Sequence, residues 1–185
     1  MSIMMTLDSI FKKSSAPRTR LFGAFSAALA FSLAAFGPAA LAQDAPKPSA
    51  HAYTTKHIYS DTADPKADIA DALKQARKEH KRVLLDFGGD WCGDCQVLDI
   101  YFHQAPNEEL LSKNYVLVHV WIGHIDHNLE YPEKYGVPIK KGVPALAVLD
   151  EKGTVLYSQK TGEFEDMRHM DASSVTSFLE KWKRS

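Results

Sequence analysis

A short apolar segment that leads into a pair of cysteines constrains the fold of this chain more than any other feature of its sequence. Residues 83–87 (Val-Leu-Leu-Asp-Phe) are apolar apart from Asp86, and Cys92 and Cys95 follow after a Gly-Gly step. An unbroken apolar run of this length is typical of a central strand that is covered on both faces. Residues 96–102 then continue with apolar side chains at helical spacing. The two cysteines are therefore expected where a buried strand passes into a helix.

These two cysteines are the only ones in the chain. Two sulfur ligands do not complete a four-ligand zinc site, and a bridge across so short a loop adds little stability. What remains is a dithiol that opens and closes as a disulfide. Cys92 leads the helix, where unpaired backbone N–H groups and the positive end of the helix dipole favour the thiolate. We therefore expect Cys92 to be the nucleophile and Cys95 the resolving thiol.

The segment that carries the cysteines resembles the active site of the thioredoxin superfamily. In that pattern an acid six residues before the first cysteine lies buried behind the second, and a tryptophan precedes the first; Asp86 and Trp91 stand at these positions. Residues 142–144 (Gly-Val-Pro) precede the apolar run 145–149 and resemble the cis-proline loop of the family. The resemblance covers roughly residues 57–184.

The resemblance implies roles for the residues around the cysteines. Asp86 would take the proton that Cys95 loses, since a carboxylate inside an apolar strand is otherwise costly to bury. Trp91 would belong to the apolar rim that receives the substrate, with partial core packing as the alternative. A cis Pro144 would leave the Val143 backbone free to pair with an extended substrate strand. The alternative for Pro144 is an ordinary trans turn proline.

Gly93 and Asp94 stand between the cysteines, and Asp94 takes the place where typical thioredoxins carry a proline. A carboxylate there should raise the energy of the thiolate and oppose the helix dipole, and Asp90 should add to this effect. Each ~30 mV of redox potential corresponds to only ~1.4 kcal/mol for this couple, which local charges easily supply. The direction of electron flow therefore does not follow from the sequence.

The first 42 residues differ in composition from the rest. They hold a basic region, then the uncharged apolar run 21–36, a Gly-Pro break and the small residues Ala40-Leu41-Ala42. This order is typical of a secretory signal peptide, cleaved between Ala42 and Gln43. An uncleaved anchor is the alternative, but the apolar run falls short of the ~20 residues of a membrane span. We expect a periplasmic or secreted protein without stable membrane association after cleavage.

Charge and composition limit the classes of molecule that are expected to bind this protein. Cleavage at residue 42 removes four of the 22 Lys and Arg and one of the 23 Asp and Glu, which leaves 18 against 22. No basic cluster survives, so nucleic acid is not an expected partner. The expected partners are protein disulfide or dithiol substrates and a redox donor or acceptor protein. The dithiol needs neither an organic cofactor nor a metal.

The periodicity of the remaining chain predicts one domain, residues 57–185, after a flexible leader, residues 43–56. Helices are expected at 65–81, with Asp64 as the cap and Pro65 at the first helical position, at 92–104, at 108–113 with Asn107 as the cap, at 128–135, and from the cap Asp171 onward. Strands are expected at 53–59, 83–87, 115–122, 145–149 and 154–159. The element order predicts an α/β, thioredoxin-like fold, with a central mixed sheet covered by helices on both faces.

Three histidines admit a metal interpretation. His119, His124 and His127 lie close together in the sequence. Clustered histidines in an exported thioredoxin-like protein suggest a copper or zinc site. Against it, His119 lies on a strand and the other two in a loop, with no acid or thiol spaced for a site. The copper-handling relatives of this fold also carry a longer spacing between their cysteines. We therefore interpret these histidines as surface or loop-structuring residues.

The sequence thus favours an exported thiol–disulfide oxidoreductase that exchanges disulfides with other proteins. The strongly oxidising disulfide-forming enzymes are expected to carry a helical insertion that this chain lacks, so reductase or isomerase-like exchange is favoured. One alternative is a metallochaperone that binds copper through the two thiolates and a histidine. Another is a non-catalytic interaction module that uses the dithiol only as a sensor.

Overall fold

The computed structural model describes residues 55–185. The predicted signal peptide, residues 1–42, and the leader up to residue 54 lie outside the described residues. In chain order, the helices and strands are α1 (Pro65–Glu79), β1 (Arg82–Gly88), α2 (Gly93–Phe102), α3 (Asn107–Asn114), β2 (Tyr115–Trp121), α4 (Glu130–Lys134), β3 (Ala145–Leu149), β4 (Val155–Ser158) and α5 (Ala172–Trp182). Two short 3₁₀ segments, η1 (Ile139–Lys141) and η2 (Met167–His169), complete the set.

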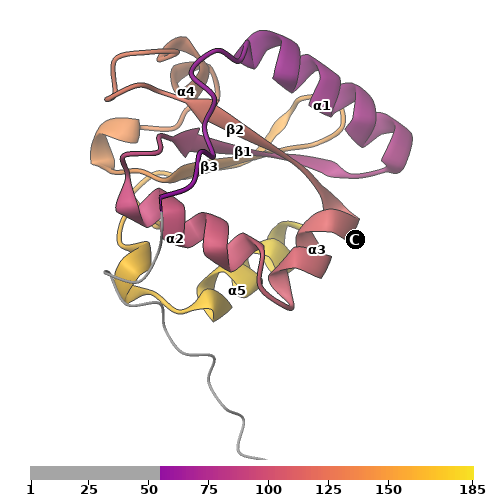
Figure 1. The fold of residues 1–185 in the computed structure, drawn as a ribbon. Coiled ribbons are helices and arrows are strands. Elements are labelled where there is room, and N and C mark those ends of the chain that lie inside the picture. Colours follow the sequence, from indigo (N-terminus) through magenta and orange to yellow (C-terminus); the bar gives the residue numbers. More distant parts are fainter. Residues whose placement is uncertain (1–54) are drawn as a thin grey trace, which may run out of the picture. The chain divides into compact units, whose positions relative to one another are not determined.

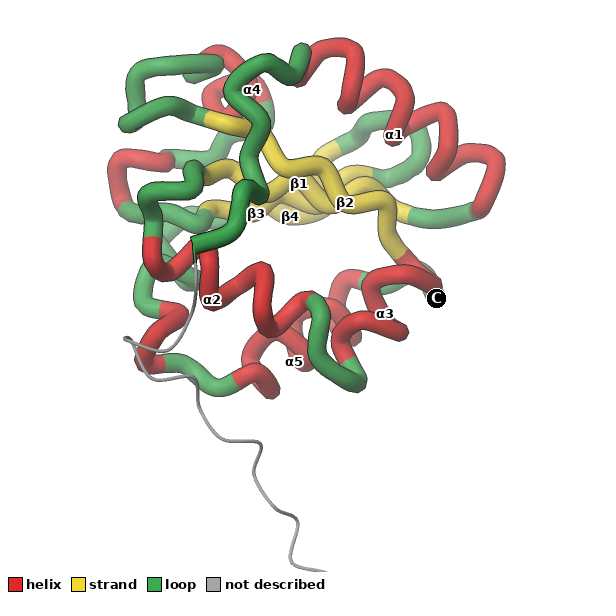
Figure 2. Tube along the Cα trace, viewed as in Figure 1, coloured by secondary structure: helices red, strands yellow, loops and turns green. Residues whose placement is uncertain are grey.

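The strands form one four-stranded mixed sheet in the order β2-β1-β3-β4. β1 pairs in parallel with β2 and antiparallel with β3, and β4 pairs antiparallel with β3 at the edge. Figure 1 shows α1 on one face of this sheet and α2, α3 and α5 on the other, and the coloured tube of Figure 2 shows the strands gathered between them. The predicted α/β, thioredoxin-like fold with a mixed sheet and helices on both faces is therefore confirmed.

The two faces of β1 belong to two separate apolar cores. Val83, Leu85 and Phe87 pack in the core that includes α1, and Leu84 packs in the core that includes α2 and α5. Because side chains alternate along a strand, Asp86 and Gly88 share the face of Leu84, which is the face that α2 covers. The register of β1 therefore turns its one acid toward the helix that carries the cysteines.

The local signals at the start of α1 behave as predicted. Asp64 caps the helix by accepting a hydrogen bond from the Lys66 amide at 2.9 Å, and Pro65 occupies the first helical position. His80 ends the helix in the left-handed conformation, with φ of 57°. The helix therefore closes two residues earlier than the predicted end at residue 81.

Two predictions about the elements are wrong. The predicted edge strand 53–59 is absent over its described part, because residues 55–59 form no strand. Their backbone is instead bound by side chains of α2 and of residues 89–92, which we call the cysteine loop, as described below. Asn107 was expected to cap α3, but its buried amide group donates to the Tyr101 and Ala172 carbonyl oxygens. The cap position falls on Pro106, which has no side-chain hydrogen bond to offer.

Within residues 55–185, no helix is both long enough and apolar enough to span a membrane.

Candidate active site

The cysteines occupy the tight turn between β1 and α2. Cys92 is the N-cap of α2; its amide donates to the Gly89 carbonyl oxygen at 3.0 Å, and its sulfur lies 3.1 Å from the Cys95 amide. The absence of a side chain at Gly88 makes this turn possible. A Cβ atom there would lie 2.8 Å from Cys95 Sγ and 2.6 Å from the Tyr59 hydroxyl oxygen, closer than real Cβ contacts. Any other residue would displace the buried sulfur.

The two cysteines are joined as a disulfide, with their Cα atoms 5.2 Å apart. Cys95 is completely buried and Cys92 keeps 5% of its surface exposed, so the order of exposure is the one expected if Cys92 attacks. Cys92 Sγ lies 3.5 Å from the Val143 carbonyl oxygen. The Val143–Pro144 peptide bond is cis. The predicted proline loop therefore lies directly against the outer sulfur.

Asp86 is buried, with 1% of its surface exposed, and it lies at the centre of a polar cluster. Its Oδ2 atom accepts a hydrogen bond from the Tyr59 hydroxyl at 2.7 Å and lies 3.0 Å from His119 Nδ1. The Tyr59 and His119 rings also contact each other edge to face, with their centroids 5.2 Å apart. The acid predicted from the sequence is therefore held by two residues that were not assigned to the site.

Burial and charge act on the two partners of Asp86 in different ways. Burial, and then the negative charge of Asp86, raise the pKa of Tyr59 well above its usual value, so the phenol stays protonated. Burial alone would lower the pKa of His119, but the hydrogen bond and the charge of Asp86 outweigh it and raise this pKa above the usual value. Asp86 therefore faces one permanent proton donor and one histidine whose charged form it stabilises.

Asp94, between the cysteines, is paired rather than free. Its side chain is 10% exposed and makes an ion pair with Arg168, whose Nη2 atom lies 3.0 Å from Asp94 Oδ2. The Arg168 Nε and backbone amide also donate to this carboxylate, at 3.1 and 3.0 Å. The sequence interpretation treated Asp94 as an uncompensated charge beside the thiolate. The structure supplies a guanidinium from η2 that balances it.

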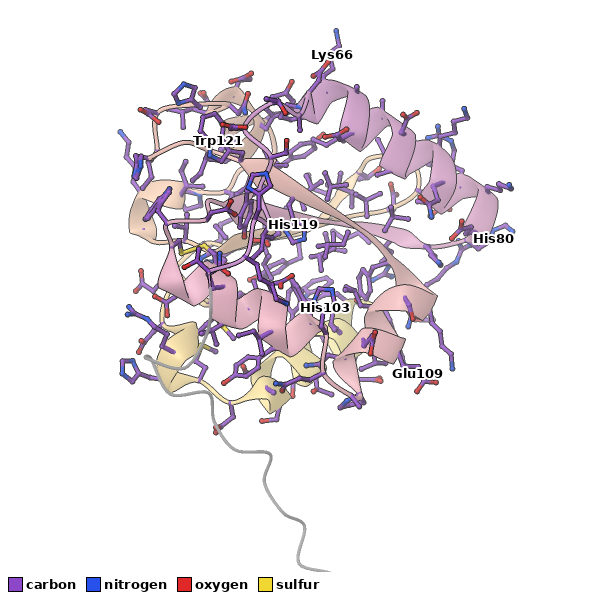
Figure 3. The ribbon with its side chains drawn as sticks, in the orientation of Figure 1. Lys66, His80, His103, Glu109, His119 and Trp121 are labelled. Atoms are coloured by element: carbon purple, nitrogen blue, oxygen red, sulfur yellow. A yellow bond between two sulfur atoms is a disulfide. The ribbon has the colours of Figure 1, made fainter. Side chains whose placement is uncertain are left out.

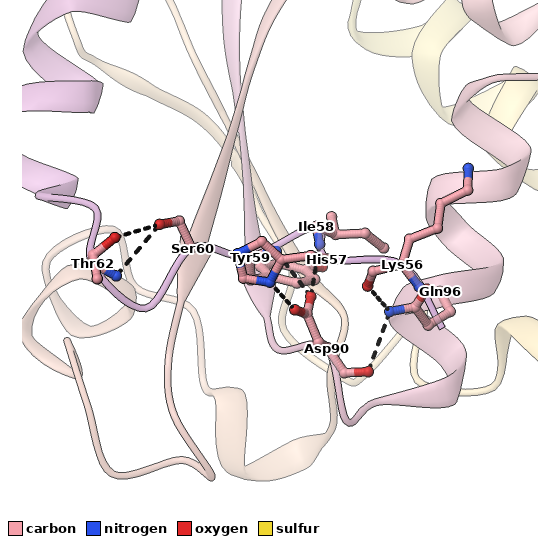
Figure 4. A network of polar contacts seen from close by, with 8 residues as sticks. All are labelled: Lys56, His57, Ile58, Tyr59, Ser60, Thr62, Asp90 and Gln96. Carbon is pink, nitrogen blue, oxygen red and sulfur yellow. Dashed lines mark hydrogen bonds and ion pairs between the residues drawn. The ribbon is translucent and has the colours of Figure 1, made fainter. Parts of the chain in front are cut away.

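Asp90 and Gln96 bind the chain segment 56–59 against the cysteine loop, as Figure 4 shows. Asp90 Oδ1 accepts the Ile58 and Tyr59 amides at 2.8 and 3.0 Å. The Gln96 side-chain amide pairs with both backbone groups of Lys56, each at 2.9 Å. Burial would raise the pKa of Asp90, but the backbone amides of Ile58 and Tyr59 and the His57 side chain lower it, so Asp90 stays charged. This segment, which we call the strap, places Tyr59 at Asp86.

Trp91 is held by contacts to residues 123 and 124 and is also exposed to solvent. Its indole N–H donates to the Gly123 carbonyl oxygen at 2.6 Å, and its ring stacks on His124 with centroids 5.1 Å apart. These contacts fix the ring in place. The residue nevertheless keeps 46% of its surface exposed next to Cys92. Trp91 is thus a rigid, exposed aromatic surface beside the outer sulfur.

The histidines have separate partners. His119 binds Asp86, whereas His124 stacks on Trp91 and His127 contacts the Trp121 ring and Asp126. In the part of the chain that the structure describes, no group of three or more His, Cys, Asp or Glu side chains is arranged to hold a metal ion. The loop histidines are loop-structuring, as interpreted from the sequence, but His119 belongs to the cluster around Asp86.

Four residues of the site carry no local signal of their own. Tyr59 and Arg168 reach the site from positions that no periodicity connects to the cysteines. Gln96 directly follows Cys95, but nothing in the sequence indicates that its side chain binds Lys56. His119 could have been found, because β1 and β2 are parallel and pair Asp86 directly with His119. Aligning the two predicted strands at Val83 and Val116 would have placed these two side chains together.

The comparisons with known proteins agree with this geometry. The Thioredoxin-like family matches residues 64–151. The crystal structure of a disulphide isomerase from Xylella fastidiosa Temecula1 is 34% identical, covers 69% of this chain and 98% of its own, and superimposes with a TM-score of 0.66.

Two longer curated proteins also match this chain. A thiol:disulfide interchange protein DsbD from Pseudomonas fluorescens is 28% identical over 75% of this chain and 22% of its own length. A protein disulfide-isomerase from Arthroderma benhamiae is 32% identical over 68% of this chain and 20% of its own length. This chain therefore spans about a fifth of the length of these two relatives.

The Asp94–Arg168 ion pair generates a prediction about the redox potential. Replacing Arg168 with Gln leaves the Asp94 carboxylate unbalanced beside Cys92, so the thiolate becomes less stable and the pKa of Cys92 rises. The reduced protein is then less favoured, and the potential should fall by roughly 10–30 mV, since ~30 mV corresponds to ~1.4 kcal/mol. Equilibration with glutathione buffers measures it. Arg184→Gln, which removes a distant arginine that pairs with Glu151, is the matched control. An unchanged or higher potential in Arg168→Gln would contradict the pairing argument.

Proposed function

Because this chain belongs to the thioredoxin-like family, we propose that it is an exported thiol–disulfide oxidoreductase that exchanges disulfides with protein substrates through Cys92 and Cys95. The observation that carries the proposal is the position of the disulfide. It lies at the N-terminus of α2, with the outer sulfur against the Val143 carbonyl and the inner sulfur buried on the face of Asp86. A disulfide placed only for stability needs neither an exposed rim nor a buried acid.

The proposed reaction begins at Cys92. Its thiolate, stabilised by the start of α2, attacks one sulfur of a substrate disulfide; a mixed disulfide forms and the other substrate sulfur leaves as a thiolate. Cys95 then loses its proton to Asp86 and attacks Cys92 Sγ. The Cys92–Cys95 bond forms, the second substrate sulfur leaves as a thiolate, and both substrate thiolates take protons from solvent. Two electrons pass from the protein dithiol to the substrate. The reverse sequence oxidises a substrate dithiol.

The surface beside Cys92 suits an extended polypeptide. The Val143 carbonyl lies against the outer sulfur, so a substrate strand that pairs with this backbone would bring its own sulfur to Cys92. The exposed ring of Trp91 offers apolar contact on the adjoining side. We assign Trp91, Val143 and Pro144 to substrate binding on these grounds. Gly93 and Asp94 separate the cysteines as the first residues of α2.

Two observations favour a reductase or isomerase-like role. Between β2 and β3 the chain carries only α4 and η1, where strongly oxidising relatives are expected to insert a helical domain. The relative with 34% identity is named a disulphide isomerase, and the chain covers 98% of it. A reductase or isomerase must be kept in its dithiol form, so this role also requires a redox donor protein as a partner.

The proposed exchange reaction predicts which cysteine forms the intermediate. Cys95→Ser should accumulate mixed disulfides with substrate proteins, because Cys92 can attack but nothing resolves the product. Cys92→Ser should accumulate few, since Cys95 is completely buried. Non-reducing gels and mass spectrometry of both variants measure the yield, and we expect at least a tenfold difference. Equal yields would refute the assignment of roles, and a larger yield from Cys92→Ser would reverse it.

Export is proposed from the signal-peptide pattern, and a redox partner outside the cytoplasm follows from it. The chain isolated from cells is predicted to begin at Gln43, which intact mass measures directly. Replacing Ala40 and Ala42 with Arg should block cleavage and leave the precursor, because the peptidase needs small residues there. A mature protein that retains residues 1–42 in the membrane fraction would contradict cleavage and replace it with anchoring.

A further inference from the structure

The exchange reaction, as described above, uses only the buried acid Asp86, but the cluster around Asp86 contains two further side chains. One carboxylate oxygen, Oδ2, faces both the Tyr59 hydroxyl and His119 Nδ1. The other, Oδ1, is buried and has no hydrogen-bond partner among the described residues. A buried acceptor without a partner destabilises the fold. Such a group is retained where it serves a reaction rather than the fold alone.

The Tyr59 hydroxyl lies beside this acid and near the inner sulfur. Its hydroxyl donates to Asp86 at 2.7 Å. The same oxygen lies 2.6 Å from the point where a Cβ of Gly88 would stand, and Cys95 Sγ lies 2.8 Å from that point. The hydroxyl and the sulfur are thus neighbours across the bare backbone of Gly88. Tyr59 is completely enclosed, and the strap holds its backbone through Asp90. Its hydroxyl has little freedom to turn elsewhere.

His119 contacts the same carboxylate oxygen as Tyr59 and reaches solvent. Its side chain is 22% exposed, whereas the Asp86 side chain is 2% exposed. Figure 3 shows His119 between α1 and α2, well away from His80 at the end of α1. The three side chains thus form a continuous path from the buried sulfur to the surface, in the order Tyr59, Asp86, His119.

Other charged groups also surround His119. Besides Asp86, the negative charges of Asp99 on α2 and Asp90 before Cys92 act on His119. Two further acids, Asp68 and Asp71 of α1, line the same surface pocket as His119. Among the described cations, Lys56 lies 3.5 Å from Asp99 and is 59% exposed. His57 pairs with Asp90 at 2.6 Å. The surroundings of His119 are therefore acidic, with Asp86 as the one acid in direct contact.

We propose that Tyr59 is a further catalytic residue of the exchange reaction, which conducts the proton from Cys95 to Asp86, and that His119 is a positioning residue, which sets how readily Asp86 accepts it. This inference rests on the proposed function. In the resolving step, the Cys95 thiol gives its proton to the Tyr59 oxygen while the Tyr59 hydroxyl gives its own to Asp86. The products are a Cys95 thiolate and a neutral Asp86 carboxyl, and Tyr59 is unchanged. Asp86 then returns its proton to solvent by way of His119.

The charge on His119 gives this relay a characteristic pH dependence. Below the His119 pKa, the imidazolium stabilises the Asp86 carboxylate and makes it a weaker base, so resolution is slow. Above that pKa, His119 is neutral and Asp86 accepts the proton more readily. Because the pKa of His119 is raised above its usual ~6.5, the increase in rate should fall above about pH 6.5.

The test separates resolution from the first attack. Reduced full-length protein is mixed with glutathione disulfide, and acid-quenched samples are analysed by mass. Formation of the Cys92–glutathione adduct depends on the glutathione disulfide concentration, whereas its resolution by Cys95 does not. Both rates are measured from pH 5.5 to 9 for the native protein and for Tyr59→Phe and His119→Gln. Tyr157→Phe on β4 and His80→Gln at the end of α1 are the matched controls.

Each variant has its own expected profile. Tyr59→Phe should resolve about tenfold more slowly at every pH, with unchanged adduct formation, because proton-transfer groups contribute ~10²–10⁴-fold and Asp86 remains. His119→Gln keeps an amide donor for Asp86 but carries no charge. It should resolve about threefold to tenfold faster than the native protein near pH 6 and within about twofold of it near pH 8.5. The controls should follow the native profile.

A purely structural role for His119 would instead slow resolution, or leave it unchanged, at all pH values, and either result would overturn the inference. Native resolution rates in Tyr59→Phe would remove Tyr59 from the path, even if His119→Gln behaved as expected. Failure of the proposed function itself is distinct, because native protein would then form no adduct with glutathione disulfide faster than a simple thiol does.

Discussion

The Asp86 carboxylate is buried inside the central strand of the sheet, and the structure around the cysteines supplies partners for one of its two oxygens. Removing a carboxylate from water costs several kcal/mol unless hydrogen bonds and charges replace the water. Here the replacement comes from two other parts of the chain, Tyr59 of the strap and His119 of β2. The acid therefore joins the strap and the two parallel strands at one point beneath the disulfide.

The strap is held in turn by the loop that carries the cysteines. Asp90 accepts its amides and Gln96 pairs with the backbone of Lys56, so the strap and the cysteine loop fix each other. On the other side of the loop, Arg168 binds Asp94 and connects α2 to η2. The two acids that flank Cys92 thus both serve as anchors with partners. Neither is an isolated charge beside the nucleophile, which was the effect expected from the sequence alone.

The parts that the sequence predicted well are those encoded by neighbouring residues. The apolar run around Asp86, the cap Asp64 and the C-x-x-C segment are all local patterns, and the fold class follows from their order. The partners of the site are not local: Tyr59 lies 27 residues from Asp86, His119 lies 33 from it, and Arg168 lies 74 from Asp94. Such contacts depend on strand register and loop path. The wrong edge strand at 53–59 has the same origin, since side chains of Asp90 and Gln96, rather than a neighbouring strand, bind that backbone.

The proposed function requires that Cys92 and Cys95 form a redox-active pair rather than a structural bridge. Equilibration of the full-length protein with glutathione buffers of graded ratio tests this most directly, with the dithiol fraction measured by thiol alkylation and mass. We predict a single reversible two-electron transition with a potential between roughly −270 and −120 mV, the range of exchange-active dithiols of this fold. A disulfide that stays closed until below about −300 mV, as structural disulfides do, would contradict the account.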